Sequence, residues 1–282
     1  MNAWLYDVAS QRRLELATRP DGRLLAKAAA GSGTHRIAVI SVPKAGTYML
    51  ARFLTHVGYV DSEWHLAEFL LTDYRGLSTE QKRGAAFRER VFQVPIGVSA
   101  GLVADGQFTV GHLPCTPYVR SSLEGFRKIF MYRNLVDAIF SRLRFRIDSG
   151  REPRSTPWVT MPPGPEQALA YLADVGRQRL HAGLAPLLGW IDEPGVVSIA
   201  YERLVGDQGE HEREACIARL AEAAGIPLEL ATSVFTTQVL GHPTPTLSGR
   251  RTEAVVYLDE RVKALLDAWG IAELNARLGY TS

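Results

Sequence analysis

The sequence predicts an α/β fold in three layers, with a central, mostly parallel sheet flanked by helices. Three short apolar segments rich in β-branched residues favour strands, at residues 36–42 and within 127–134 and 195–202. The first two lead through a polar turn into an amphipathic helical pattern, and the chain after the third is mostly helical. Strands that alternate with helices are typical of a parallel sheet covered on both faces.

Residues 1–35 are expected to form an N-terminal appendage, and residues 36–282 a single α/β domain. The appendage has strand-like runs around the Pro20–Gly22 turn, which suit a hairpin, and a linker at 28–34. Glycine and proline divide the rest of the chain. The further elements expected there are a strand at 106–112, helices at 47–57, 63–74, 78–90, 136–147 and 166–191, a proline-rich loop at 148–165, and a break at 241–251.

The composition is that of a folded protein of ordinary charge. Of the 282 residues, 46% are hydrophobic and 22% are charged. A net charge of +2 does not indicate bulk binding to nucleic acid. Cys115 and Cys216 form no metal-ligand or disulfide pattern, which favours a reducing compartment. No apolar run is long enough to span a membrane and no signal-peptide pattern is present, so we expect a cytoplasmic protein.

The turn after the first strand, residues 43–48, is suited to binding an anion. It follows the carboxyl end of a strand, where open α/β sheets bind their ligands. A helix that begins near Gly46 directs N–H groups and its positive dipole end at that point. Lys44 adds a point charge, and Thr47 adds a hydroxyl donor. The pattern lacks the two glycines that a Walker A loop has before its lysine. A solvated turn lysine is the alternative.

A second strand, turn and helix supply further anion-binding groups. Arg133 lies in the turn and offers a planar guanidinium suited to a phosphate. Ser141 follows eight residues later, about two turns into the helix, where its hydroxyl can add a hydrogen bond. Asp137 at the helix start either favours the helix dipole or orients Arg133.

These two turns resemble the nucleotide-binding motifs of the sulfotransferases that use 3′-phosphoadenosine 5′-phosphosulfate (PAPS). PKAGTY resembles their PKSGT-type loop, and YRNLVDAIFS resembles their YRNPxDxxxS element. The resemblance implies a P-loop-like fold in which the first loop binds the 5′-phosphosulfate and the second element binds the 3′-phosphate. The implied binding residues are Lys44, Ala45, Gly46, Thr47 and Tyr48 for the 5′ side, and Arg133 and Ser141 for the 3′-phosphate.

A third segment, GHLPCTPY, resembles the KTHLP-like segment of cytosolic sulfotransferases, whose histidine is the catalytic base. The resemblance implies that His112 accepts the proton of the acceptor hydroxyl, and imidazole has a pKa suited to that role at neutral pH. The family's lysine in this segment is replaced by Val110. Glycan-type members use an acidic base after the first helix, so three acidic residues keep the assignment open: Asp61, Glu63 and Glu68.

The resemblance is weaker for the residues around adenine. The aromatic residue that often packs there is Met49 in this chain, so Tyr48 is an alternative stacking partner. SIAYERL resembles the family's YEDL segment and implies that Tyr201 lies near adenine. LSGRR resembles a basic loop over the 3′-phosphate and implies contacts from Arg250 and Arg251.

The implied reaction is in-line transfer of a sulfuryl group from PAPS to a hydroxyl of a small-molecule or glycan acceptor. The product nucleotide is adenosine 3′,5′-bisphosphate (PAP). The candidate catalytic residues are His112, Lys44 and Ser141, with Lys44 neutralising the departing phosphate oxygen. No metal is required, because a sulfuryl group carries less charge than a phosphoryl group. Two alternatives stay open: a non-catalytic nucleotide-binding domain of the same fold, and a P-loop-type small-molecule kinase.

The acceptor side is expected to be formed by residues 61–105, 112–122 and 148–165. Aromatic walls of this kind suit a sugar, a phenol or a lipid-like compound. We expect no nucleic-acid partner and no membrane span, and leave a homodimer open. The aromatic residues in these segments are Trp64, His65, Tyr74, Phe92, Tyr118 and Trp158.

Overall fold

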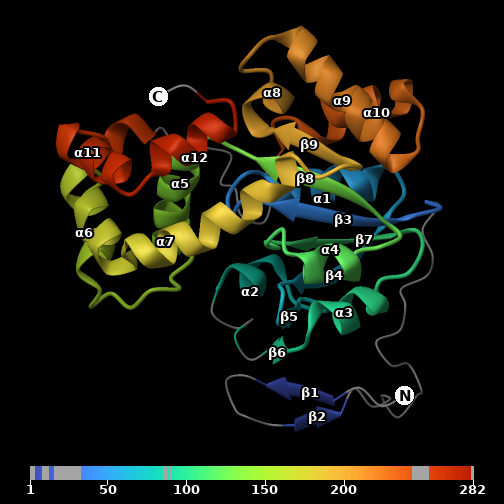
Figure 1. Ribbon diagram of the computed structural model, residues 1–282, viewed down its shortest axis with the longest axis horizontal. Helices are drawn as coiled ribbons and strands as arrows, with labels where there is room; N and C mark the ends of the chain where they lie inside the picture. The colour runs from blue at the N-terminus through green and yellow to red at the C-terminus, as the bar shows by residue number, and fades with distance from the viewer. Residues whose placement is uncertain are drawn as a thin grey trace.

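The computed structural model describes residues 4–7, 13–15, 33–84, 88, 90–242 and 254–280. In this part of the chain, nine strands form one sheet in the order β2-β1-β6-β5-β4-β7-β3-β8-β9 (Figure 1). The strands are β1 (Trp4–Asp7), β2 (Arg13–Glu15), β3 (Arg36–Ser41), β4 (Val60–Leu66), β5 (Leu70–Asp73), β6 (Val91–Gln93), β7 (Gln107–Gly111), β8 (Phe126–Tyr132) and β9 (Val196–Ala200).

Helices surround this sheet in the described residues. They are α1 (Thr47–His56), α2 (Thr79–Arg83), α3 (Ile96–Ser99), α4 (Pro117–Ser122), α5 (Leu135–Asp148), α6 (Pro165–Val175), α7 (Arg177–Leu184), α8 (Tyr201–Val205), α9 (Glu210–Ala224), α10 (Leu228–Val234), α11 (Glu260–Ala268) and α12 (Ile271–Arg277). Short 3₁₀ segments are η2 (Ala100–Leu102), η3 (Pro157–Val159), η4 (Ala185–Ile191) and η6 (Ala254–Tyr257), and η5 (Phe235–Val239) is a π-helix.

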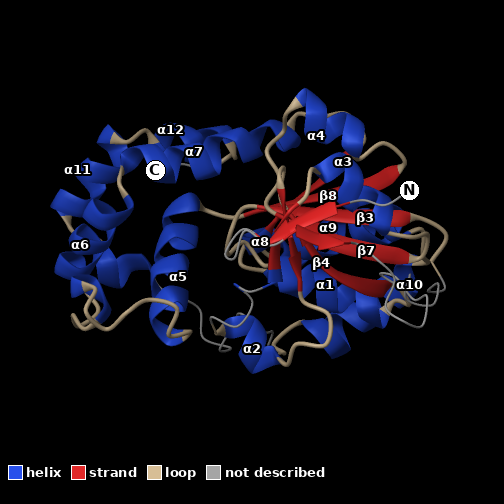
Figure 2. Ribbon diagram, turned by 90° about the horizontal axis from the view of Figure 1, so that it is seen from below, coloured by secondary structure: helices blue, strands red, loops and turns tan. Residues whose placement is uncertain are grey.

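The centre of the sheet is parallel, as expected. Strands β4, β7, β3, β8 and β9 all pair in the same direction. Strand β3 is buried along nearly its whole length, which is the pattern of a strand covered on both faces. Figure 2 shows α3 and α4 on one side of the sheet and α1 and α10 on the other. The predicted three-layer α/β fold is therefore confirmed.

A group of helices lies beyond the carboxyl ends of the parallel strands. In Figure 1, β3 points toward α5, α6, α7, α11 and α12, which stand apart from the sheet. The loops that follow β3, β7, β8 and β9 therefore face this helical group across one edge of the sheet. That arrangement places the predicted functional turns together.

The predicted helix over 63–74 is wrong, because this segment forms strands β4 and β5. In β4, Ser62, Trp64 and Leu66 are buried in alternation, which is the period of a strand with one covered face. Pairing with β7 on one side and β5 on the other holds the segment extended. The ladder to β7 shifts register between Asp61 and His65, at a bulge that contains Glu63 with a φ of 55°.

Two other predicted helices are shorter than expected. Helix α2 covers only the start of segment 78–90: a capping box between Ser78 and Gln81 begins it, and Gly84 follows its last residue. The stretch 166–191 contains α6, α7 and η4, with Gly176 at a φ of 73° between the two α-helices. The predicted proline-rich loop ends at α6 and contains the short segment η3.

The N-terminal strands pair as a hairpin, and β1 also pairs with β6 in antiparallel fashion. Both strands precede the predicted Pro20–Gly22 turn, which lies outside the described residues. The domain boundary at residue 35 stays a prediction. Among the described residues, no helix combines the length and apolar character needed to cross a membrane.

Candidate active site

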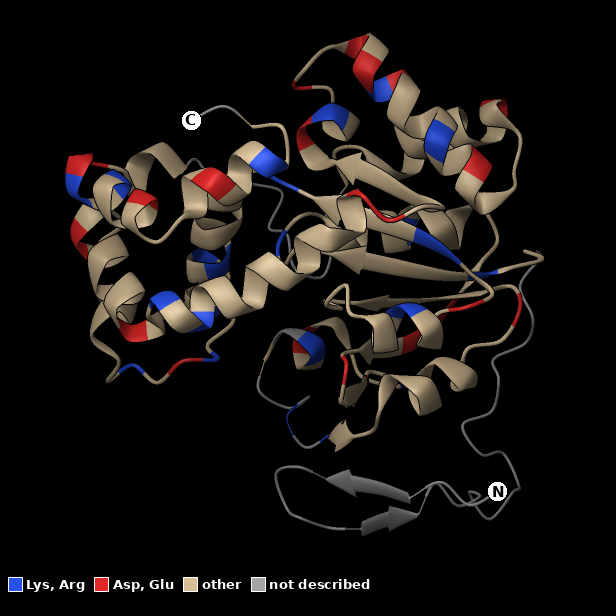
Figure 3. Cartoon of the chain, viewed as in Figure 1, with Lys and Arg blue, Asp and Glu red and all other residues tan. Residues whose placement is uncertain are grey.

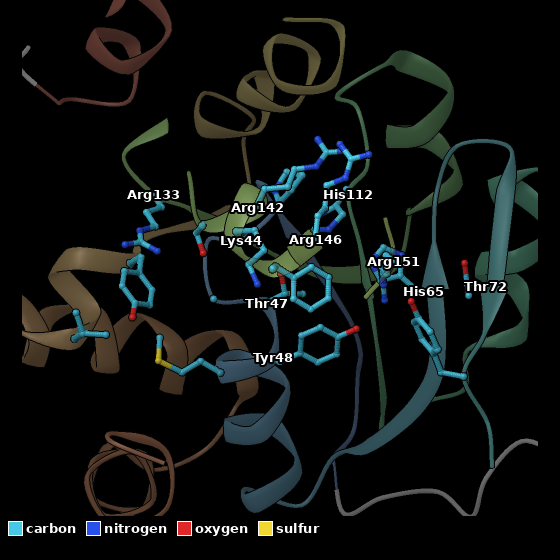
Figure 4. A pocket seen from close by; sticks show the side chains of 18 of the residues that line it. Lys44, Thr47, Tyr48, His65, Thr72, His112, Arg133, Arg142, Arg146 and Arg151 are labelled. Carbon is cyan, nitrogen blue, oxygen red and sulfur yellow. The ribbon is translucent and has the colours of Figure 1, made fainter. Parts of the chain in front are cut away.

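A cavity of about 750 Å³ lies where the carboxyl ends of β3, β7 and β8 meet α5, α7 and α8 (Figure 4). Ala45 does not line it, because this residue is fully buried and its N–H donates to the Val42 carbonyl at 3.1 Å. Arg250 and Arg251 lie outside the described residues. The cavity brings together the other predicted site residues: Lys44, Gly46, Thr47, Tyr48, His112, Arg133, Ser141 and Tyr201.

The loop before α1 requires glycine at position 46. Gly46 has a φ of 103°, and a Cβ atom there would lie 2.8 Å from Met131 Cε and 2.9 Å from Tyr201 Cδ2. No side chain caps α1, so the first N–H groups of the helix are available to a ligand. The Lys44 ammonium lies 4.2 Å from the centre of the Phe145 ring. The loop therefore offers backbone donors and a cation at one wall of the cavity.

Arg133 is a buried cation with unused donors. Its side chain lies 3.6 Å from Glu202 and 3.7 Å from Asp137 and is 4% exposed, so both carboxylates compensate its charge. Its Nε and Nη2 atoms nevertheless donate no hydrogen bond to the described residues. Buried donors without acceptors are costly, and an anion that reaches them would satisfy them. The ring of Tyr201 lies 4.8 Å from the Arg133 guanidinium, and Ser141 lines the same cavity.

The turn that carries Arg133 is held by residues from the end of the chain. Asn134 caps α5 by accepting from the N–H groups of Val136 and Asp137. Asn275 of α12 accepts from the Leu135 N–H at 2.7 Å. Glu202 accepts from the Asn134 N–H at 3.2 Å and from the Tyr280 hydroxyl. None of these supports was predicted from the sequence, where the signal for Glu202 is that it follows Tyr201 at a strand end.

His112 is oriented by the end of the neighbouring strand. Its Nδ1 atom lies 2.8 Å from the carbonyl oxygen of Ser41. A carbonyl can only accept, so this bond assigns the proton to Nδ1 and leaves the lone pair on Nε2. Burial lowers the pKa of His112 to about 4, with smaller contributions from the charges of Arg142 and Lys44 and an opposing one from the Ser41 bond. The imidazole is therefore neutral at pH 7 and can accept a proton.

A second histidine, His65, lines the cavity next to His112. The two ring centres are 5.0 Å apart, and the planes meet at 68°. Burial, with smaller contributions from the positive charges of protonated His112 and of Arg151, lowers the pKa of His65 to about 3. His65 was expected only as one of the aromatic residues of the acceptor side, because a helix was predicted for this segment. Strand β4 sets His65 opposite Val110 of β7, two residues before His112.

None of the three acidic alternatives to His112 lines the cavity in the described structure. Glu63 accepts from Lys82 at 2.7 Å, and Glu68 accepts from Thr116 at 3.0 Å. Asp61 accepts from the Glu63 N–H at 2.7 Å, and burial raises the pKa of Asp61 to about 6. One oxygen of each carboxylate accepts from a group outside the cavity, whereas His112 lines the cavity wall.

Tyr48 extends toward the part of the cavity away from Arg133 (Figure 4). Its hydroxyl donates to the Tyr74 hydroxyl, which also accepts from Arg151. Burial raises the pKa of Tyr48 above its ordinary value. Because the Tyr48 side chain extends away from Arg133, its orientation does not support the expected alternative in which Tyr48 stacks on adenine. Arginines that the sequence analysis did not single out also line the cavity: Arg88, Arg142, Arg146, Arg151 and Arg179.

The chain shares its fold with a sulfotransferase and a retinol dehydratase of known structure. Mouse sulfotransferase SULT7A1, solved in complex with PAP, aligns over 99% of this chain and 100% of its own with a TM-score of 0.53 and 12% identity. Retinol dehydratase, solved with retinol and PAP, aligns over 89% of this chain and 83% of its own with a TM-score of 0.53 and 12% identity. No protein-family model matches the sequence, and no curated protein sequence matches it.

Proposed function

We propose that this protein is a sulfotransferase that uses PAPS and transfers its sulfuryl group to a hydroxyl of a small-molecule or glycan acceptor. One observation carries the proposal: a single cavity contains the uncapped start of α1, the unused donors of buried Arg133, and neutral His112. The likeness to PAP-bound structures of a sulfotransferase and of a retinol dehydratase supports the same proposal. The cytoplasmic location and any homodimer stay predictions.

The residues present fit a nucleotide with phosphates at both its 5′ and 3′ positions. The N–H groups at the start of α1, together with Lys44 and Thr47, would hold the 5′ side. Arg133 and Ser141 would hold the 3′-phosphate, since both line the cavity and a planar guanidinium suits a phosphate. Tyr201 packs against both sets, between Arg133 and the Gly46 backbone.

When bound, PAPS supplies a sulfuryl group already joined to a good leaving group. His112 Nε2 takes the proton of the acceptor hydroxyl as its oxygen forms a bond to sulfur. The bond from sulfur to the 5′-phosphate oxygen breaks, and its electron pair stays on that oxygen. Lys44 and the N–H groups of α1 stabilise the charge that develops there. The rest of the catalysis is positioning, as in phosphoryl transfer.

Thermal melting with PAP in EDTA, and separately with ATP and magnesium, tests the donor class. At a hundred times its dissociation constant, a ligand stabilises a protein by about 2.7 kcal/mol. We expect PAP to raise the melting temperature of the wild-type protein and of Lys263→Ala, whose lysine pairs with Glu260 at the surface. The shift should shrink in Lys44→Ala and disappear in Arg133→Ala. Arg133→Lys keeps the charge but loses the fork, and should recover little of it.

The same experiment separates the alternatives. A shift with ATP and magnesium but none with PAP would reject the sulfotransferase reading in favour of a kinase. A shift with PAP, without release of PAP from PAPS in the presence of any hydroxyl compound, would favour a nucleotide-binding domain that has lost the chemistry.

A further inference from the structure

The cavity lining contains more cationic side chains than the proposed function uses. Its described lining contains seven Lys and Arg residues against two carboxylates, Glu152 and Asp207. The proposed function uses only two of the seven, Lys44 and Arg133. Figure 3 shows basic residues on α5 and α7, two helices that border the cavity. The five that remain are all arginines: Arg88, Arg142, Arg146, Arg151 and Arg179.

Two of these arginines lie next to the proposed base. Arg142 and Arg146 are one turn apart on α5, so they lie on the same helix face. Figure 4 shows both side chains beside His112. The charge of Arg142 contributes to the low pKa of His112, which independently places the two groups close together. A ligand whose hydroxyl reaches His112 therefore has these guanidinium groups nearby.

Their charges are only partly compensated. Arg146 forms a pair with Glu152 at 2.6 Å, so its charge is balanced. Arg151 donates to the carbonyl of Lys82 at 2.7 Å, and Arg88 donates to the carbonyl of Arg151 at 2.9 Å. Burial also lowers the pKa of Arg151. Arg142 makes no hydrogen bond or ion pair with any residue in the described ranges.

Building on the proposed function, we infer that the acceptor is an anion: a small hydroxyl compound that also carries a carboxylate, sulfate or phosphate group. Its charged group binds Arg142, with Arg151 on the far side of the cavity, while its hydroxyl lies at His112. Guanidinium groups bind such oxyanions through paired hydrogen bonds. A neutral phenol would leave Arg142 partly desolvated without a counter-charge, which is unfavourable.

Matched acceptors test this inference. We would measure the release of PAP from PAPS at pH 8 with 4-hydroxyphenylacetate and with its neutral carboxamide. A second pair of charged and neutral acceptors is 4-hydroxybenzyl phosphate and 4-hydroxybenzyl alcohol. At this pH His112 stays neutral in every variant. We expect kcat/KM to be roughly 10- to 150-fold higher for the charged member, the factor that a hydrogen bond to a charged group supplies.

Arg142→Gln should remove most of this preference, and Arg142→Lys should restore part of it. Arg144→Gln is the matched control, because Arg144 lies on the same helix, pairs with Asp148 at 3.8 Å and does not line the cavity. It should keep the full preference. The PAP melting shift of each variant reports separately on folding and on the nucleotide site.

The outcomes distinguish the two proposals. If PAP fails to stabilise the wild-type protein, the proposed function is wrong and this inference falls with it. If PAP binds but the charged acceptors react no faster than their neutral partners, or react equally well in Arg142→Gln, the anionic acceptor is wrong and the sulfotransferase proposal stands.

Discussion

The Nδ1 atom of His112 lies 2.8 Å from the carbonyl oxygen of Ser41, which joins the residue after β7 to the last residue of β3. The Ser41 hydroxyl lies 2.6 Å from the Thr47 hydroxyl, at the start of α1. One residue of the central strand therefore contacts both the proposed base and the proposed nucleotide loop. This contact fixes the imidazole so that Nε2 can act as the base.

Replacing His112 by asparagine should reduce turnover by roughly 10²- to 10⁴-fold, the contribution typical of a general base. The melting shift with PAP should be retained, because His112 contacts neither Arg133 nor the first N–H groups of α1 in the proposed scheme. Release of PAP from PAPS with a phenolic acceptor measures the first quantity. Glu63→Gln is the control, since Glu63 pairs with Lys82 away from the cavity. Loss of activity in Glu63→Gln, with full activity in His112→Asn, would reverse the assignment.

The acid limb of the rate profile should lie well below that of an ordinary histidine. The pKa of His112 is about 4, so kcat/KM should stay level from pH 8 to about pH 5 and fall below it as the base becomes protonated. The charge of Arg142 lowers this pKa, so Arg142→Gln should move the acid limb to higher pH. Arg144→Gln should leave the limb in place. A limb near pH 6.5 in the wild-type protein would contradict the buried, neutral imidazole.

Much of the nucleotide side could be predicted from the sequence, because its groups lie in short contiguous motifs. Lys44 to Tyr48 and Arg133 to Ser141 each follow a strand with a short, buried apolar run, and strands of that kind are easily recognised.

The acceptor side could not be predicted in the same way. In strand β4, buried and exposed positions alternate over only a few residues. The strand is extended because it pairs with β5 and with β7, and β7 lies far along the chain, so a local pattern does not show this pairing. Its misassignment hid the contact between His65 and His112. The arginine cluster draws on α5, α7 and the loops around them, so no local motif contains it.

The free energy of unfolding should fall on acidification because of the two neighbouring histidines. The folded pKa values of His65 and His112, about 3 and about 4, lie below the value of an unfolded chain. Their contribution is fully present above about pH 6.5 and is lost as the pH falls toward the folded values, since only the unfolded chain takes up protons there. Each should cost about 1 to 2 kcal/mol between pH 7 and pH 5.

Urea unfolding of the protein at pH 7 and at pH 5 measures this loss. His65→Gln should make the difference smaller, because the new side chain does not titrate. His211→Gln is the control, since His211 is exposed on α9 and should leave the difference unchanged. Equal losses in the wild-type protein and in His65→Gln would show that His65 is not held neutral in the fold.

Replacing Gly46 by alanine should weaken both the fold and PAP binding. The φ of 103° is unfavourable for alanine, and the new Cβ would meet the Tyr201 ring at 2.9 Å. We expect a cost of roughly 1 to 3 kcal/mol in unfolding free energy, the range for strained backbone positions. Any movement of Tyr201 also disturbs its contact with Arg133.

Gly183→Ala in α7 is the control for Gly46→Ala, because nothing lies within 4 Å of the Cβ position at residue 183 and alanine is more favourable than glycine in a helix by up to about 1 kcal/mol. Denaturant unfolding and PAP titration measure the two effects, and unchanged values for Gly46→Ala would rule out the close backbone approach proposed for this loop.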